Sequence, residues 1–320
     1  MARRTVRRAI RIPLAAAVAV AMGALSQLPA HADTAASSYP VDYDFATGAL
    51  VGFLTPDTPP PGANDWGCKP SAAHPEPVVL VNGTFANMHD NWGAAAPLLA
   101  NHGYCVFAFD YGSPFAGSPI TATGDIAASA GELAAFTDQV LSATGASKVD
   151  LVGHSQGGMM PRYYLKNLGG AAKVDKLVGL APSNNGTTLD GITALASQWG
   201  LLEPANRFLV QACAACVQQE AGSPFLTGLN AGGETVPGVD YTVIATKDDE
   251  VVTPYTNAFL PAAPNVHDIT VQNQCGLDGS DHLEIAADPI AMADVLNALD
   301  PAHPVPVPCE VVLPVTGPLG

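Results

Sequence analysis

One serine stands in a setting that could make it a nucleophile. Residues 148–158 read KVDLVGHSQGG, an apolar run that leads into Gly-x-Ser-x-Gly and then into a stretch with helical spacing. A sharp strand-to-helix turn would strain Ser155 and expose its hydroxyl, and only small residues fit beside it at Gly153 and Gly157. Because the chain has 31 glycines, the motif alone is weak evidence. The strand before it and the helix after it make Ser155 the candidate nucleophile.

A carboxylate is needed to orient the base that activates such a serine. Active sites of open parallel sheets form at the carboxyl ends of strands, so we look for acids that follow an apolar run. Residues 241–245, YTVIA, are such a run, and TKDDEVV comes directly after it. Asp249 is the candidate acid, and Asp248 is its best substitute.

His282 is the candidate base. It lies in the loop SDHL, after the apolar run 266–271 and just before the last helix. The chain order is then serine, acid, histidine, as in hydrolases that carry the strand-to-helix motif. His89 is the only serious rival, because it follows the first core strand and could touch a substrate. His154, next to the serine, is expected to face the wrong way.

Two backbone N–H groups should face the carbonyl oxygen on which negative charge develops. One is expected from Gln156, directly after the nucleophile at a helix N-terminus. The other is expected from the loop NGTFAN at 82–87, where we choose Thr84. The hydroxyl of Thr84 could add a third donor, and the alternative is a turn threonine without such a role.

Apolar side chains gather in sequence around these two loops. Phe85, Met88 and Met159 are the candidates for an acyl-binding pocket, together with Met160 and Trp92. Packing in the core explains methionines and aromatic residues at least as well.

Acidic residues crowd the sequence around His282 and raise the question of a calcium site. A solvated acidic loop is the favoured interpretation, so neither a metal nor any cofactor is predicted. The acids concerned are Asp278, Asp281, Glu284 and Asp288.

The elements that must position these residues are read from apolar runs and helical spacing. Helical stretches at 126–141 and 159–168 lie between short apolar runs, and this alternation predicts an α/β fold. We expect a mostly parallel central sheet with helices on both faces. The runs expected to be strands are 78–81, 105–109, 149–152, 177–180, 241–245 and 266–271.

The alternation breaks at about 185–230, the one sizeable insertion. Leu189, Ile192, Leu195, Ala196 and Trp199 have helical spacing there. The insertion is either a lid or cap over the site or a helix packed permanently on the core.

The first 32 residues have the pattern of a signal peptide. A basic stretch precedes an apolar run that is too short to span a bilayer, and Ala-His-Ala at 30–32 predicts cleavage after Ala32. We therefore expect a secreted, extracellular protein. Both the general and the twin-arginine export routes stay open.

The exported chain is expected to form one catalytic domain with two proline-rich extensions. The domain covers 64–300, the N-terminal arm 33–63, and the C-terminal tail 301–320, which we expect to run extended over the surface. The tail contains LPVTG at 313–317, which looks like a cell-wall sorting motif but lacks the apolar and basic residues that normally follow it.

The charge of the chain limits its partners. The formal net charge is −16 at pH 7, which makes nucleic acid an unsuitable partner. We expect a monomer without a stable membrane anchor, whose partners are an ester substrate and a lipid–water interface.

Six cysteines in an exported chain suggest three disulfides, although six thiols allow 15 pairings. Spacing favours a local bridge between Cys213 and Cys216. The other expected bridges would tie each proline-rich extension to the domain, and they are Cys68–Cys105 and Cys275–Cys309.

Five segments resemble the secreted triacylglycerol lipases of actinobacteria, over roughly 64–301. They read VVLVNGTFANMHDNW, DLVGHSQGGMMPRYYLK, AGSPFLTGLNAGG, YTVIATKDDEVVTPY and SDHLEIAADP. The resemblance implies the α/β-hydrolase fold and a serine–histidine–aspartate triad. Asn82 is a departure, because such lipases usually have histidine there, and it bears on loop stability and chain-length preference. The positions that match the family's catalytic and oxyanion residues are Ser155, Asp249, His282, Thr84 and Gln156.

Together these expectations predict a lipase that cleaves acylglycerol esters through an acyl-enzyme intermediate. An alternative is a cutinase-like carboxylesterase for soluble esters or polyesters, without interfacial activation. A catalytically dead binding module on the same fold is a third reading, and the presence of a serine, an acid, a histidine and an oxyanion loop argues against it.

Overall fold

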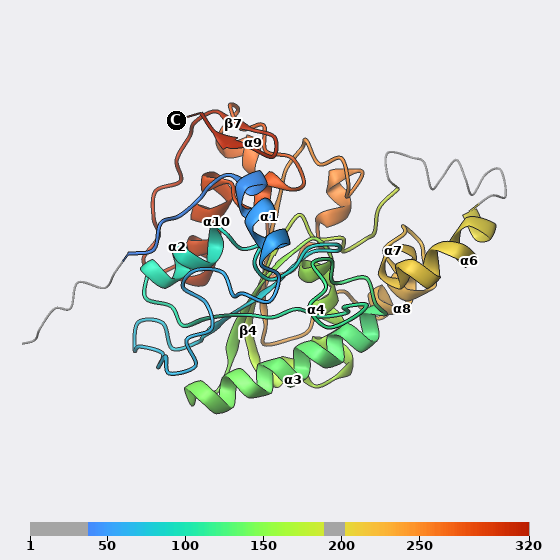
Figure 1. Ribbon diagram of the computed structural model, residues 1–320, viewed down its shortest axis with the longest axis horizontal. Coiled ribbons are helices and arrows are strands. Elements are labelled where there is room, and N and C mark those ends of the chain that lie inside the picture. The colour runs from blue at the N-terminus through green and yellow to red at the C-terminus, as the bar shows by residue number, and fades with distance from the viewer. Residues whose placement is uncertain (1–37, 189–201, 320) are drawn as a thin grey trace, which may run out of the picture. The chain divides into compact units, whose positions relative to one another are not determined.

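A six-stranded parallel sheet forms the centre of the protein, whose computed structural model describes residues 38–188 and 202–319. The order across the sheet is β2-β1-β3-β4-β5-β6 (Figure 1). The predicted signal peptide, 1–32, lies outside the described residues. The strands are β1 (Val78–Val81), β2 (Val106–Ala108), β3 (Val149–His154), β4 (Val174–Leu180), β5 (Asp240–Ala245) and β6 (Val266–Thr270).

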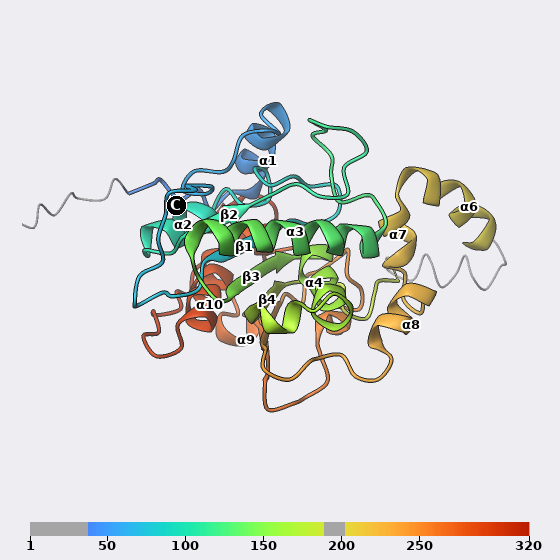
Figure 2. The same cartoon turned by 90° about the horizontal axis from the view of Figure 1, so that it is seen from below.

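Helices cover both faces of the sheet, which confirms the predicted fold class. Successive residues of β1 point to opposite faces: Val79 and Val81 pack in one apolar cluster, and Val78 and Leu80 pack in the other. Every residue of β1 and β3 is buried, as expected for strands covered on both sides. The first cluster includes α3 (Ile126–Thr144) and α4 (Gln156–Asn167), and the second includes α2 (Ala95–Asn101) and α10 (Pro289–Leu299) (Figure 2).

The strand order fixes where a site can form. The chain leaves β1 for its neighbour β2 and then returns to pair β3 on the other side of β1. The loops that follow β1 and β3 therefore turn in opposite directions above the carboxyl end of the sheet. This topological switch point is where open α/β sheets bind their ligands. It brings the loop at 82–87 next to the turn that contains Ser155.

The insertion predicted at 185–230 contains three described helices, α6 (Leu202–Ala212), α7 (Ala214–Gln218) and α8 (Pro224–Asn230). Residues 189–201, which include all five apolar residues expected on a lid helix, lie outside the described residues. The described part contacts the domain through α7, which packs against α3. Whether the insertion moves as a lid stays a prediction.

The N-terminal arm contains a helix that the sequence analysis missed, α1 (Phe45–Leu54). Asp44 caps it, because its side chain accepts a hydrogen bond from the N–H of Thr47 at 3.1 Å. Phe45 is buried in a small cluster with residues near α10. The arm is thereby attached to the domain rather than free of it.

The end of the C-terminal tail forms a hairpin, which the expectation of an extended segment did not include. Strands β7 (Val312–Leu313) and β8 (Gly317–Pro318) form an antiparallel hairpin around the LPVTG sequence. Gly317 has a φ of +75°, and a Cβ there would lie 1.9 Å from the carbonyl oxygen of Tyr43. The hairpin turn and its contact with the arm therefore both require glycine at this position.

Three disulfides join the six cysteines in the pairings that the sequence analysis expected. They are Cys68–Cys105, Cys213–Cys216 and Cys275–Cys309. Cys275–Cys309 joins the C-terminal tail to the domain, and Cys68–Cys105 lies within the domain, close to the end of the N-terminal arm. Cys213–Cys216 lies within the insertion at the start of α7.

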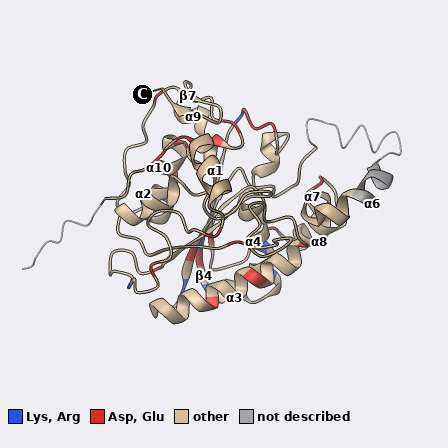
Figure 3. Ribbon diagram, viewed as in Figure 1, with Lys and Arg blue, Asp and Glu red and all other residues tan. Residues whose placement is uncertain are grey.

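Charged residues near the start of the central strands lie far from the carboxyl ends where the candidate site residues gather. Lys148 pairs with Asp175 at 3.1 Å, and Lys176 lies 3.8 Å from Asp150 at the same end of β3 and β4. Figure 3 shows blue and red segments together beside the label of β4. No described helix is long and apolar enough to cross a membrane. The remaining short helices are η1 (Gly170–Ala172), η2 (Tyr255–Ala258), α9 (Val271–Gln274) and η3 (Glu284–Ala286).

Candidate active site

Ser155 occupies the turn between β3 and α4. Its φ of +53° and ψ of −121° are unusual for a residue with a side chain, and such backbone strain concentrates at functional sites. The N–H of Ser155 donates to the carbonyl of Leu180 on β4 at 2.9 Å, which ties the turn to the sheet. This is the strained strand-to-helix geometry expected for a nucleophilic serine.

The two flanking glycines permit this turn. A Cβ on Gly153 would lie 1.9 Å from the carbonyl oxygen of Gly157, and one on Gly157 would lie 1.9 Å from the carbonyl oxygen of Val81. Both contacts are with backbone, which cannot swing aside. The small residues therefore let α4 begin directly against β1 and β3.

His282 and Asp249 are brought together in the loops that follow β6 and β5. The Nδ1 of His282 lies 2.9 Å from Oδ2 of Asp249, and both side chains are buried. The other carboxylate oxygen of Asp249 accepts the N–H groups of Val251 and Val252 at 2.9 and 2.7 Å. Asp248, the substitute acid, is exposed. The catalytic roles of these residues stay predictions.

His154 links the nucleophile turn to the histidine loop, which the sequence analysis did not foresee. Its Nε2 lies 2.8 Å from the carbonyl oxygen of His282, and the two rings lie 5.0 Å apart. Burial, and then the nearby His282, lower the pKa of His154 to about 3. The Nδ1 of the same ring lies 3.1 Å from the side-chain oxygen of Asn91, so each ring nitrogen contacts an oxygen. The buried ring of His154 therefore connects the turn that contains Ser155 with the backbone of His282.

His89, the rival base, is engaged elsewhere. Its Nδ1 lies 3.2 Å from the hydroxyl oxygen of Thr55, at the end of α1. Asp249 contacts His282 and not His89 among the described residues. The carboxylate–imidazole pair therefore favours His282.

The two predicted oxyanion residues are in direct contact. The side-chain amide of Gln156 donates to the hydroxyl oxygen of Thr84 at 3.0 Å. Gln156 is the first residue of α4, so its N–H precedes the first intrahelical hydrogen bond. The N–H groups on either side of Thr84, those of Gly83 and Phe85, each donate to an oxygen elsewhere in the chain, at 2.7 and 3.1 Å. The N–H of Thr84 has no acceptor within the part of the chain that the structure describes.

The three candidate pocket residues have different surroundings. Phe85 is 54% exposed and has a φ of +69°, so it presents its ring at the surface beside Thr84. Met88 is partly buried against the α2 and α10 side of the core. Met159 is completely buried in the opposite cluster. Core packing, the alternative explanation, accounts for Met159.

The acids near His282 do not form the solvated loop that the sequence suggested. All four are buried, and each accepts at least one backbone N–H group. Asp288 caps α10 by accepting from Ile290 and Ala291, and Glu284 accepts from the N–H of Phe45 at 3.3 Å. Burial is the main cause that raises the pKa of Glu284 to about 9. No group of three or more ligands among the described residues could hold a metal ion.

Comparison with known proteins identifies the family. Residues 75–290 match the family described as lipase (class 2), which is more than half of the chain. The chain belongs to the class 2 lipases. The resemblance to lipases found in the sequence is therefore confirmed, and the match spans β1 to the start of α10, including the elements that carry all five candidate catalytic and oxyanion residues.

The class 2 lipase is similar in sequence to two curated proteins over a short segment. Triacylglycerol lipases of Pseudarthrobacter phenanthrenivorans and Burkholderia plantarii are each 38% identical to it over 97 residues, 29% of this chain. The matched segment is 28% of the first relative and 25% of the second. The chain thus matches about a quarter of the length of these relatives.

Two solved structures resemble the class 2 lipase in fold. Lipase B of Aspergillus fumigatus is 20% identical, with a TM-score of 0.55, over 78% of this chain and 57% of that one. The Bacillus licheniformis lipase BlEst2 in its propeptide form is 18% identical, with a TM-score of 0.51, over 80% of this chain and 55% of that one. At this identity the likeness concerns the fold alone, and it agrees with the α/β-hydrolase architecture.

Proposed function

We propose that this class 2 lipase is a secreted serine hydrolase that cleaves the carboxylic ester bonds of acylglycerols. The observation that carries the proposal is the 2.9 Å hydrogen bond between His282 and Asp249, together with the 2.8 Å contact of the His282 carbonyl with His154, the residue before the strained Ser155. The two triacylglycerol lipases that share a segment with the chain support acylglycerols as substrates. The signal-peptide pattern at 1–32 supports export.

The first half-reaction transfers the acyl group to the enzyme. The hydrogen bond to Asp249 places a proton on Nδ1 of His282 and leaves Nε2 as the base. The hydroxyl oxygen of Ser155 attacks the ester carbonyl carbon while Nε2 takes the hydroxyl proton. The tetrahedral intermediate then breaks its bond to the alkoxy oxygen, which leaves as the alcohol with the proton from His282. An ester of Ser155 remains.

The second half-reaction releases the acyl group. Water gives a proton to Nε2 of His282 and attacks the carbonyl carbon of the acyl-enzyme. When that intermediate collapses, Ser155 recovers its proton and the carboxylic acid departs. In both halves the N–H groups of Thr84 and Gln156 stabilise the negative oxygen, since neither is needed for secondary structure.

Substitution of the nucleophile tests this function. We expect Ser155→Ala to lower kcat on p-nitrophenyl butyrate by about 10⁶-fold, because no other group can form the acyl-enzyme. A fluorophosphonate probe should label the parent protein and not this variant. Ser142→Ala, on the exposed side of α3, is the matched control and should keep full activity and labelling. Ester hydrolysis that persists in Ser155→Ala would refute the assignment.

The lipid interface is tested with tributyrin. Rates measured below and above its solubility limit separate a lipase, whose rate rises at the phase boundary, from an esterase that saturates on dissolved substrate. We expect the rise. A rate that is already saturated below the limit would instead identify a carboxylesterase with the same triad.

A further inference from the structure

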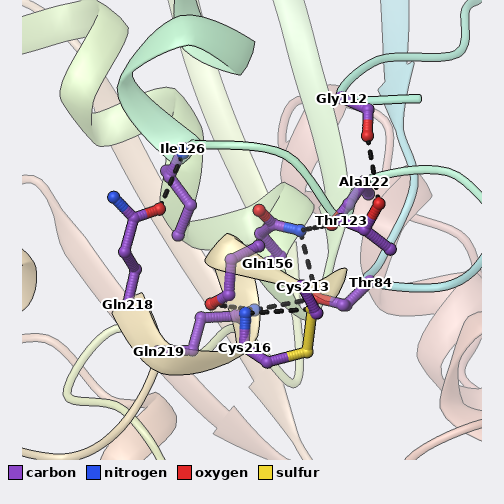
Figure 4. The surroundings of a disulfide bond; sticks show 11 residues. Thr84, Gly112, Ala122, Thr123, Ile126, Gln156, Cys213, Cys216, Gln218 and Gln219 are labelled. Atoms are coloured by element: carbon purple, nitrogen blue, oxygen red, sulfur yellow. Dashed lines mark hydrogen bonds between the residues drawn. A yellow bond between two sulfur atoms is a disulfide. The ribbon is translucent and has the colours of Figure 1, made fainter. Parts of the chain in front are cut away.

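The insertion brings one glutamine into contact with the oxyanion loop. Gln219 follows α7 directly, and its amide Nε2 lies 2.8 Å from the hydroxyl oxygen of Thr84. The two residues are 135 positions apart in sequence and both come close to Gln156 (Figure 4). The side chain of Gln219 is almost completely buried, so this contact is made within the packed interior of the protein.

The orientation of the Gln219 amide is fixed at both of its ends. Nε2 also donates to the carbonyl oxygen of Ala215 at 3.2 Å, and Oε1 accepts the hydroxyl proton of Ser183 at 2.8 Å. A reversed amide would place its oxygen against the carbonyl of Ala215, where two acceptors would repel. The group that faces Thr84 is therefore an N–H donor.

Both lone pairs of the Thr84 hydroxyl are thereby occupied. A hydroxyl group has two acceptor positions and one proton to donate. Gln156 Nε2 fills one acceptor position at 3.0 Å and Gln219 Nε2 fills the other at 2.8 Å. Gln156 is held in turn by the carbonyl of Ala122, to which the same Nε2 donates at 2.7 Å. Only the proton of Thr84 is left, and among the described residues no acceptor takes it.

We propose that Gln219 is a positioning residue, which turns the Thr84 hydroxyl so that its proton points to the oxygen of the substrate carbonyl. The proposal rests on the proposed ester hydrolysis and adds a specific role for the insertion. The hydroxyl becomes a third donor to the developing oxyanion, oriented before the substrate arrives. Donors fixed in advance stabilise a transition state without the cost of reorganisation.

The surroundings of α7 explain how the insertion holds Gln219 in place. The disulfide between Cys213 and Cys216 closes the first turn of α7. The N–H of Ala215 donates to the carbonyl of Thr123 at 3.2 Å, which joins α7 to the segment before α3. Gln218 accepts from the N–H of Ile126 at 2.8 Å, on the side of α7 that does not contact Thr84 (Figure 4).

A double-mutant cycle between Gln219 and Thr84 tests the proposal. We expect Gln219→Ala to lower kcat on p-nitrophenyl butyrate about 10-fold with little change in KM, and Thr84→Val to lower it about 100-fold. Because Gln219 acts through the hydroxyl, Gln219→Ala should cause no further loss of kcat in the Thr84→Val background. In the Thr84→Ser background, which keeps the hydroxyl, Gln219→Ala should again lower kcat. A merely structural glutamine would cost the same in all three backgrounds, and that result would overturn the proposal.

Two further variants keep the test independent of stability. Gln219→Glu preserves the shape but offers an acceptor to the Thr84 proton, so kcat should fall at least as far as in Gln219→Ala; an unchanged kcat would overturn the proposal. Gln218→Ala loosens the same helix without touching Thr84, and it should keep the kcat of the parent. Fluorophosphonate titration counts the folded active sites in every variant. A parent that neither reacts with this probe nor cleaves esters would refute the proposed function instead.

Discussion

At the scale of single residues, two adjacent aspartates show how surroundings decide between acids that the sequence cannot separate. Asp249 is buried against His282, and its second oxygen accepts two backbone N–H groups, while Asp248 is exposed. A buried carboxylate held from both sides can fix the direction of an imidazole. An exposed one has neither the contact nor the constraint.

The pair gives a prediction with its own control. Asp249→Asn should lower kcat by about 10⁴-fold, because an amide in this place favours the imidazole tautomer that carries its proton on the nitrogen needed as the base. Asp248→Asn should leave kcat within about twofold of the parent, since its side chain contacts no proposed catalytic group. Steady-state kinetics on p-nitrophenyl butyrate measure both. A large loss in Asp248→Asn with little loss in Asp249→Asn would reverse the assignment.

At the scale of elements, the sheet was predictable because its strands are short, continuous apolar runs. The candidate acid and histidine were chosen with the rule that parallel strands end at one edge of the sheet. That rule needs no knowledge of side-chain contacts. Helix α1 was missed because its sequence, FATGALVGFL, has apolar residues on most sides and no polar face to reveal a period. The hairpin of the tail depends on contacts with that helix and with the arm, which no local pattern records.

The disulfides differ in what they should contribute to stability. Cys68–Cys105 closes a loop between residues 37 positions apart, whereas Cys213–Cys216 joins residues only 3 positions apart. In the chain-entropy description, removal of the first should lower the free energy of unfolding by about 4 kcal/mol and removal of the second by about 2 kcal/mol. Urea unfolding of the two paired Cys→Ala variants measures the difference. Equal losses, or a larger one for Cys213–Cys216, would contradict this order.

At the scale of the whole molecule, one buried acid connects segments from both ends of the chain with the histidine loop. Glu284 lies two residues after His282, accepts from the N–H of Phe45 in α1, and would lie 3.2 Å from a Cβ on Gly317 in the tail hairpin. The sequence analysis placed this acid in solvent, because its burial depends on a partner 239 positions away. Burial, and then the neighbouring acids Asp288, Asp281 and Asp44, raise its pKa to about 9.

This raised pKa predicts the direction in which stability changes with pH. The folded protein keeps the proton of Glu284 where the unfolded chain has lost it, so between about pH 4.5 and pH 9 the unfolded state binds fewer protons. The contribution of Glu284 to the free energy of unfolding is therefore complete below pH 4.5 and is lost as pH rises towards 9. Glu284→Gln keeps an acceptor for Phe45 and cannot ionise, so it should lose less stability over this range than the parent.

Urea unfolding at pH 5, 7 and 9 compares the two proteins. The difference in stability between Glu284→Gln and the parent should grow in favour of the variant as pH rises. Glu132→Gln, at an exposed position of α3, is the matched control and should follow the parent. If the free energy of unfolding of Glu284→Gln changed with pH as that of the parent does from pH 5 to pH 9, Glu284 would not carry its proton in the folded protein. The junction of arm, histidine loop and tail would then hold a charged carboxylate.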